Sequence, residues 1–308
     1  MRGSDNSLVN PSLASGMRGQ AAVETAIVMP LMTFMVLGII QLTMMQQASL
    51  MTEYAAYQAC RAGVVWNGNN DKMVDAAIVA LAPTAPGGKL FPGSQPIHEG
   101  TQGLVDLAAT VASMQLVNRA TGLVNMSPIR IDVINPDTST FSSYAGRSGL
   151  PKPNELVFDD VGYSSTDGKT DGFLSDEGYR KALQLTIRVR YLYEMKIPFA
   201  AWIIQTCFFA ANAPRIVFNQ VGGALGEESI THKSAVESGD ADATAAAMAA
   251  AAAANGALTD GPKGKPILTA AEFLKLYGFR AAGIYLVPLT ASYTLRMQSN
   301  FYKGNLTN

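Results

Sequence analysis

One acidic residue, Glu24, stands at the start of an apolar run that is otherwise free of charge. The chain carries no charged residue in 25–52, and its most apolar part is 26–42. An ionised carboxylate beside such a run is costly to bury, so we expect it either to pair with a cation or to reach water at an interface. The sequence alone leaves both alternatives open.

Side chains suited to catalysis are few. The two histidines, His98 and His232, lie in polar, loop-like stretches that predict surface positions. Neither a glycine-rich nucleotide motif nor a nucleophile elbow is present. We therefore expect no enzyme and no cofactor.

Two acidic or hydroxyl-rich stretches were candidates for metal binding. In the acidic segment 159–178, a calcium loop counted from Asp167 would need glutamate at position twelve, where the chain has Gly178. The stretch 137–141 ends in Phe141 and so falls one residue short of an Asp-x-Ser-x-Ser metal motif. The sequence therefore predicts no metal site.

The two cysteines, Cys60 and Cys207, are far apart in the chain and have no metal-ligand spacing. In an oxidising compartment they could form one disulfide. They could equally stay free, because a buried free cysteine behaves as a small apolar residue. The sequence leaves both alternatives open.

The overall composition favours a membrane-associated or densely packed protein. The chain has 23 basic and 24 acidic residues, so nothing in its charge indicates a nucleic-acid partner. Charged residues make up only 15% of the chain, against roughly 25% in soluble proteins.

The charge-free run is long enough to cross a lipid bilayer, which takes roughly 20 apolar residues. The segment before it carries Arg2 and Arg18 but only one acid, Asp5, which favours a cytoplasmic N-terminus and export of everything after the helix. Ala48 and Leu50 make a poor signal-peptidase site, so we expect a signal anchor rather than a cleaved signal peptide.

The helix is expected to continue beyond the membrane. Ala48, Met51, Ala55, Ala59 and Ala62 recur at steps of three and four residues, which is typical of one helical face. A single helix over about 21–62 is predicted, ended by Gly63 and the Asn-Gly-Asn-Asn that follows at 67–70. Pro30 falls inside it and is expected to kink it, which a membrane helix tolerates.

The stretch Gly-Gln-Ala-Ala-Val-Glu at 19–24 resembles a type IV prepilin processing site. The resemblance implies that a prepilin peptidase cuts after Gly19, that Gln20 becomes the new N-terminus, and that Glu24 becomes the fifth residue of the mature chain. In that family, the glutamate is thought to meet the N-terminal ammonium of a neighbouring subunit.

More narrowly, the chain resembles the TadE/TadG-like pseudopilins of tight-adherence pili. The match rests on Gly19, Ala22, Val23, Glu24, Ala26, Pro30 and Gly38. Thr25 departs from the family, which usually has phenylalanine there. Two further stretches resemble family segments: 57–65, through Ala59, Arg61 and Gly63, and the closing strand 289–298.

The resemblance implies a non-enzymatic minor pilin, with Glu24 and Pro30 in the assembly helix. Its partners would be other pilin subunits, the prepilin peptidase, the inner-membrane assembly platform and the lipid bilayer. It would lie in the bacterial inner membrane with its C-terminal domain in the periplasm, and outside the cell once assembled. The alternative is a signal-anchored periplasmic scaffold or binding protein that enters no filament.

The chain divides into a leader (1–19), a transmembrane and assembly helix (20–63) and an exported domain (64–308). Within the domain, apolar spacing predicts helices over 71–83 and 103–121. Strands are predicted over 128–136, 183–195 and 283–297. The fold class expected is α+β, with an antiparallel sheet and flanking helices.

Three details of the domain follow from its local patterns. Alternation in 183–195 predicts a strand with one packed face and one wet face, and the wet face carries Gln184, Thr186, Arg188, Arg190 and Glu194. Pro288 confines its own strand to an edge or a bulge. The apolar block 196–214 is too short for a second span, so we expect a buried or interface helix. The Ala-rich segment 238–266 is a low-complexity insertion.

Overall fold

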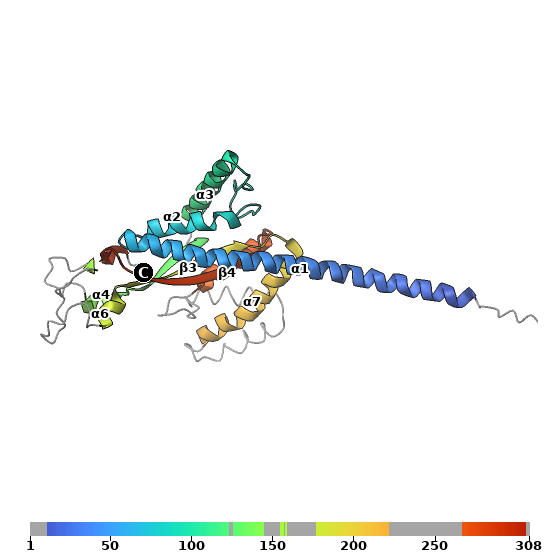
Figure 1. The fold of residues 1–308 in the computed structure, drawn as a ribbon. Coiled ribbons are helices and arrows are strands. Elements are labelled where there is room, and N and C mark those ends of the chain that lie inside the picture. Colours follow the sequence, from blue (N-terminus) through green and yellow to red (C-terminus); the bar gives the residue numbers. More distant parts are fainter. Residues whose placement is uncertain are drawn as a thin grey trace, which may run out of the picture.

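One long helix forms the axis of the molecule, and an α+β domain is built around its C-terminal half (Figure 1). The computed structural model describes residues 11–122, 126–144, 155–156, 158, 177–221 and 267–305. Helix α1 covers Pro11–Val65, and its 55 residues correspond to a length of about 82 Å. The α+β fold class is confirmed.

Helix α1 is longer than predicted at both ends. It begins at Pro11, and proline suits a first helical position because the N–H it lacks would have no partner there. Gly63 does not end the helix. The chain turns instead at Asn67 and Gly68, which have positive φ angles of 59° and 71°.

The remaining helices flank this axis. The predicted helices over 71–83 and 103–121 are confirmed as α2 and α3, and the Asn69 side chain caps the first of them. The elements are α2 (Asn70–Leu81), η1 (Ala82–Thr84), α3 (Thr101–Gly122), α4 (Thr138–Tyr144), α6 (Glu177–Ala182), α7 (Pro198–Val221), α10 (Ala270–Ala281) and η3 (Lys303–Asn305).

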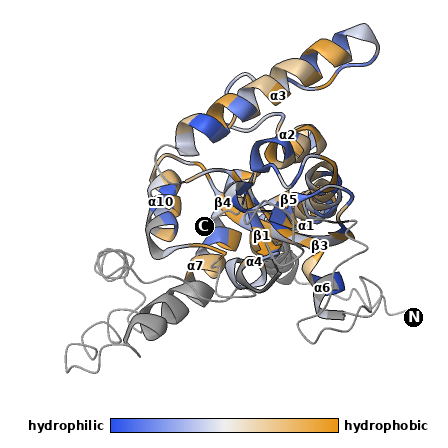
Figure 2. Cartoon of the chain, turned by 90° about the vertical axis from the view of Figure 1, so that its left-hand side faces the viewer, coloured by the Kyte–Doolittle hydropathy of each residue, from blue (hydrophilic) through white to orange (hydrophobic). Residues whose placement is uncertain are grey.

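The main sheet is antiparallel, with strand order β1-β3-β4. Its strands are β1 (Ile129–Asn135), β3 (Gln184–Glu194) and β4 (Leu286–Arg296), and a small second sheet pairs β2 (Glu155–Leu156) with β5 (Phe301–Tyr302). All three predicted strands form. Pro288 lies in β4 at the edge, as expected. Figure 2, which looks along the molecule, shows α10 across the strands from α1, and α3 outside α2.

Small residues let the second half of α1 approach the sheet and α2 closely. A Cβ added to Gly63 would lie 2.6 Å from Met73 Sδ and 2.7 Å from Leu185 Cδ2, both of which belong to fully buried side chains. Gly63 is therefore a contact point within the helix rather than its terminator. The buried face consists of Ala48, Thr52, Ala55, Ala56, Ala59, Cys60, Gly63 and Val64.

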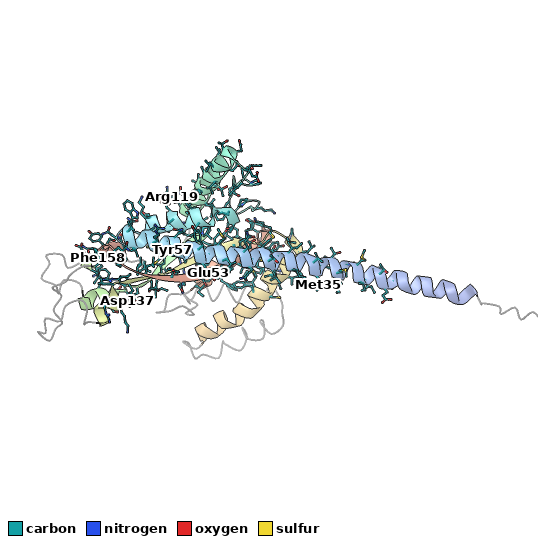
Figure 3. The ribbon with its side chains drawn as sticks, viewed as in Figure 1. Met35, Glu53, Tyr57, Arg119, Asp137 and Phe158 are labelled. Atoms are coloured by element: carbon teal, nitrogen blue, oxygen red, sulfur yellow. The ribbon has the colours of Figure 1, made fainter. Side chains whose placement is uncertain are left out.

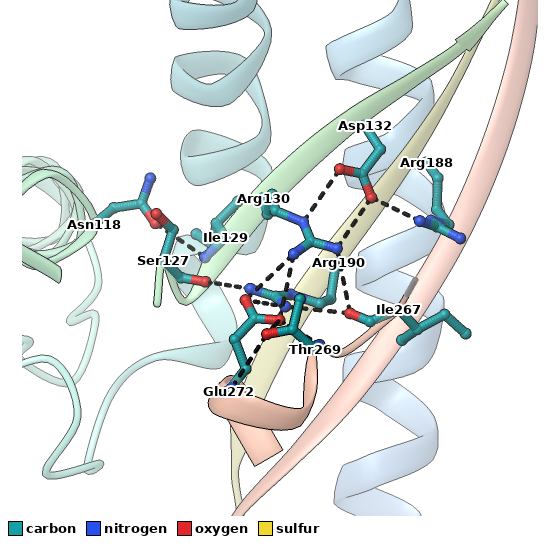
Figure 4. A network of polar contacts seen from close by, with 10 residues as sticks. All are labelled: Asn118, Ser127, Ile129, Arg130, Asp132, Arg188, Arg190, Ile267, Thr269 and Glu272. Carbon is teal, nitrogen blue, oxygen red and sulfur yellow. Dashed lines mark hydrogen bonds and ion pairs between the residues drawn. The ribbon is translucent and has the colours of Figure 1, made fainter. Parts of the chain in front are cut away.

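The prediction that β3 has a wet face is wrong for the middle of the strand, although Gln184 at its start is exposed. Arg188 and Arg190, which were assigned to that face, are only 4% and 0% exposed. They are buried because carboxylates meet them: Arg188 Nη2 lies 2.8 Å from Asp132 Oδ2, and Arg190 Nη1 lies 2.6 Å from Glu272 Oε1 (Figure 4). Arg130 contacts both of these acids.

This ion-pair network joins β1, β3 and α10. Burial lowers the pKa of the Arg190 guanidinium, and the ion pair with Glu272 opposes that shift. Glu272 also forms a capping box with Thr269, which fixes the start of α10. The network therefore holds an element from the end of the chain against the central strand.

Glu272→Gln tests what the charge contributes. Glutamine can still complete the capping box, so the change isolates the lost carboxylate, which leaves Arg190 buried without its counter-ion. We expect the free energy of unfolding to fall by about 3–5 kcal/mol, measured by chemical denaturation of the full chain in detergent. Glu99→Gln, at an exposed carboxylate, is the matched control. An equal loss in the two variants would contradict this role.

Candidate assembly and membrane interface

The first half of α1 projects beyond the domain as an apolar rod (Figure 1). In the described residues, Val23–Val65 is the one helix long and apolar enough to cross a membrane, and none of its most apolar 18-residue window is buried. In Figure 3, Met35 stands on this rod, whereas Tyr57 lies within the domain. The exposed apolar side chains of the rod include Val23, Ile27, Met29, Leu31, Met32, Phe34, Met35, Val36, Ile39 and Ile40.

Glu24 is exposed near the outer end of this rod. The next acid along the helix is Glu53, which is also exposed but lies beside the domain (Figure 3). Gly19 and Gln20, the two residues of the predicted processing site, lie within the helical backbone of α1, and the structure describes nothing further of them. Cleavage between them stays a prediction.

Pro30 lies inside the rod, in unbroken helix. Proline has no N–H, so the carbonyl four residues earlier, that of Ala26, loses its usual helical donor. Nearby hydroxyls are satisfied within the helix: Thr33 Oγ1 donates to Met29 O at 2.9 Å, and Thr43 Oγ1 donates to Ile39 O at 2.9 Å. The hydroxyls of Thr33 and Thr43 can therefore enter an apolar phase with their donors already paired.

The domain first touches the rod through α7. The rings of Phe34 and Phe199 stack with their centroids 4.0 Å apart. Two turns further along α1, the fully buried Gln41 accepts a 3.0 Å hydrogen bond from the backbone N–H of Ile197. Sequence patterns did not reveal this junction. The only local signal was a glutamine near the end of an apolar run.

Among the residues that the structure describes, no group of three His, Cys, Asp or Glu side chains could hold a metal ion. His98 is a surface residue, as predicted, and hydrogen bonds from its ring and backbone lower the pKa of Asp106. Asp137 caps α4 by accepting from the Thr140 N–H at 2.8 Å.

Several predicted features cannot be placed. His232, the Ala-rich insertion 238–266 and most of the acidic segment lie outside the described residues. A polar hollow of about 480 Å³ lies between α2, α3 and β1, lined by residues that include Asp71, Asp75 and Arg119.

The long helix also matches a known protein family. The family model for TadE-like proteins matches residues 19–61. Residues 19–61 are TadE-like. The resemblance inferred from the sequence motifs is thereby confirmed over this segment. No curated protein and no solved structure matches the chain.

The TadE-like segment spans both halves of α1. It begins before Glu24, runs through the exposed rod, and ends at Arg61, where the helix is packed against the sheet and α2. The segment therefore includes both the apolar rod and the face of α1 that packs against the domain. The likeness over this segment suggests a component associated with Tad pili.

Both cysteines are free in the structure, so the disulfide considered from sequence is not formed. Cys60 is buried in α1 and its thiol donates to Leu185 O at 3.4 Å, whereas Cys207 is exposed on α7. Burial raises the pKa of the Cys60 thiol to about 12. The thiolate, which is the reactive form, is therefore suppressed at Cys60.

A thiol-labelling experiment checks this assignment. In the folded full chain in detergent, only Cys207 should react with a maleimide. At pH about 9 the Cys60 thiol should still stay unlabelled, because its raised pKa keeps it in the unreactive thiol form. After denaturation both thiols should react, without prior reduction.

The control is Cys207→Ser, which should take up no label until it is unfolded. Two thiols that become reactive only after a reductant is added would show a disulfide instead. Rapid labelling of the folded Cys207→Ser variant would show that Cys60 is accessible.

Proposed function

We propose that this protein is a non-enzymatic minor pilin, or pseudopilin, of a Tad-like type IV pilus. Its α1 crosses the bacterial inner membrane once, with the N-terminus in the cytoplasm and the domain in the periplasm. A prepilin peptidase cuts after Gly19. The assembly platform then moves the subunit into a filament, where its domain lies outside the cell.

The observation that carries this proposal is the single acid on the exposed rod of a TadE-like helix. Glu24 precedes 28 uncharged residues, 25–52, and is exposed on the part of α1 that projects from the domain. A plain membrane anchor gains nothing from a carboxylate at that position, because ionisable residues in spans are costly and usually functional.

A partner for the carboxylate would appear when subunits assemble. Cleavage after Gly19 creates an ammonium at Gln20, four residues before Glu24. A parallel neighbouring helix shifted by about one turn brings its ammonium level with this carboxylate. Pairing would offset the cost of placing each charge among apolar side chains, and only one stagger achieves it. Glu24 would thus fix the axial register of the subunits.

Glu24→Ala tests the register role. The variant should still insert into the membrane and be processed, because it removes a costly charge. Its incorporation into filaments should fall at least about tenfold, the effect of about 1.4 kcal/mol, as measured by immunoblotting of sheared filaments against the membrane fraction.

Glu53→Ala is the matched control, since it removes an exposed carboxylate from the same helix outside the apolar rod. It should assemble normally. Undiminished assembly of Glu24→Ala would contradict the register role and favour the signal-anchored scaffold.

A further inference from the structure

The first two turns of α7 expose an apolar surface, which we call the α7 tip: Phe199, Trp202 and Ile203. Their exposed fractions are 39%, 46% and 41%. They do not lie on the face of α7 that packs into the domain, because that face carries Ala201 and Gln205, which are fully buried. The α7 tip is thus an apolar surface that the described part of the domain leaves open.

The α7 tip contacts α1, so the depth of the tip in a membrane follows from the position of that contact along α1. Phe199 stacks on Phe34, so the two residues are level along the axis of α1. Only nine residues, 25–33, separate Glu24 from Phe34, and they span about 14 Å. Even the stretch counted from Gly19 covers only about 22 Å, which is less than the roughly 30 Å hydrocarbon core.

A span that starts near Glu24 therefore cannot be complete at Phe34. It must continue past the contact with α7, toward Gln41 and Thr43. Counted from Gly19, the ring of Phe199 lies about 22 Å into the hydrocarbon core, within the outer leaflet, and counted from Glu24 it lies about 14 Å in, next to the inner boundary of that leaflet. The rest of the α7 tip lies next to it. If the rod crosses the membrane, the domain cannot stand clear of the lipid.

The surroundings of the α7 tip suit the boundary between lipid and water. Arg280 lies over the Trp202 ring, 5.9 Å from its centroid, and donates to Thr206 Oγ1 at 3.0 Å. Lys196 precedes the tip, with its ammonium near Pro86 O. Tryptophan is enriched at membrane interfaces, and long basic side chains lie along apolar surface while their charge reaches phosphate or water.

The neighbouring acid does not oppose this arrangement. Glu194 accepts hydrogen bonds from the backbone N–H groups of Lys89 and Leu90, at 2.7 Å and 2.6 Å. Its carboxylate is thus held by the domain's own backbone. The α7 tip is an apolar surface with Arg280 at its rim, which complements an acyl layer beneath anionic headgroups.

We propose that the α7 tip inserts into the outer leaflet of the lipid bilayer. The domain is then held at the membrane by two elements, α1 and the α7 tip, and lies against its surface. This inference rests on the proposed function only in placing α1 across the membrane. It names the bilayer as the partner of a surface that no family feature assigns.

The two tryptophans of the chain give a direct test. The full chain is reconstituted at low density into vesicles whose acyl chains carry bromine, which quenches tryptophan emission. In Trp66→Phe the only emitter is Trp202, and it should lose most of its emission. In Trp202→Phe the only emitter is Trp66, about 37 Å beyond Gln41 along α1, and it should keep its emission.

Two matched charge insertions make the result specific. On the Trp66→Phe background, Ile203→Asp should restore the emission of Trp202, because a carboxylate is expelled from lipid. Leu116→Asp changes an equally apolar residue that is 70% exposed on α3, and it should leave the quenching unchanged.

Each outcome decides the proposal. An unquenched Trp202 in a chain that resists carbonate extraction overturns the insertion of the α7 tip and leaves the membrane role of α1 standing. A chain that carbonate extracts overturns both. A change in Trp202 emission that grows with the number of chains per vesicle, and not with the amount of brominated lipid, would show that a second copy covers the tip. That result would also overturn the proposal.

Discussion

The structure depends on one helix that must satisfy two different environments. The exposed rod of α1 is apolar on every side, which is stable only in lipid or among other apolar helices. Its second half turns alanines, Cys60 and Gly63 toward the sheet, so that the backbone of α1 comes close to β3. Because the helix is continuous, the position of the domain is set by the position of the span.

Periodic patterns predicted most of this framework. The helical spacing of α1, α2 and α3 and the alternation in β3 were sufficient to place those elements, and the motif around Glu24 was sufficient to identify the TadE-like segment. These signals are local, since each one depends on residues within a few turns or a few strand positions of one another.

The errors came from partners distant in sequence. Arg188 and Arg190 alternate with apolar residues as solvent-facing residues would, and their burial depends on ion pairs with Asp132 and Glu272, which are far away in the chain. Gly63 was taken as a helix end because the close approach of Met73 and Leu185 cannot be read from its neighbours. The stacking of Phe34 on Phe199 was missed for the same reason.

The central claim is that α1 is a processed assembly helix and not a plain anchor. The mass of the N-terminal peptide of the protein isolated from its own membranes tests this most directly. A chain that begins at Gln20 is the predicted result, because only removal of residues 1–19 creates the ammonium that Glu24 is proposed to meet. A chain that begins at Met1 would contradict the claim.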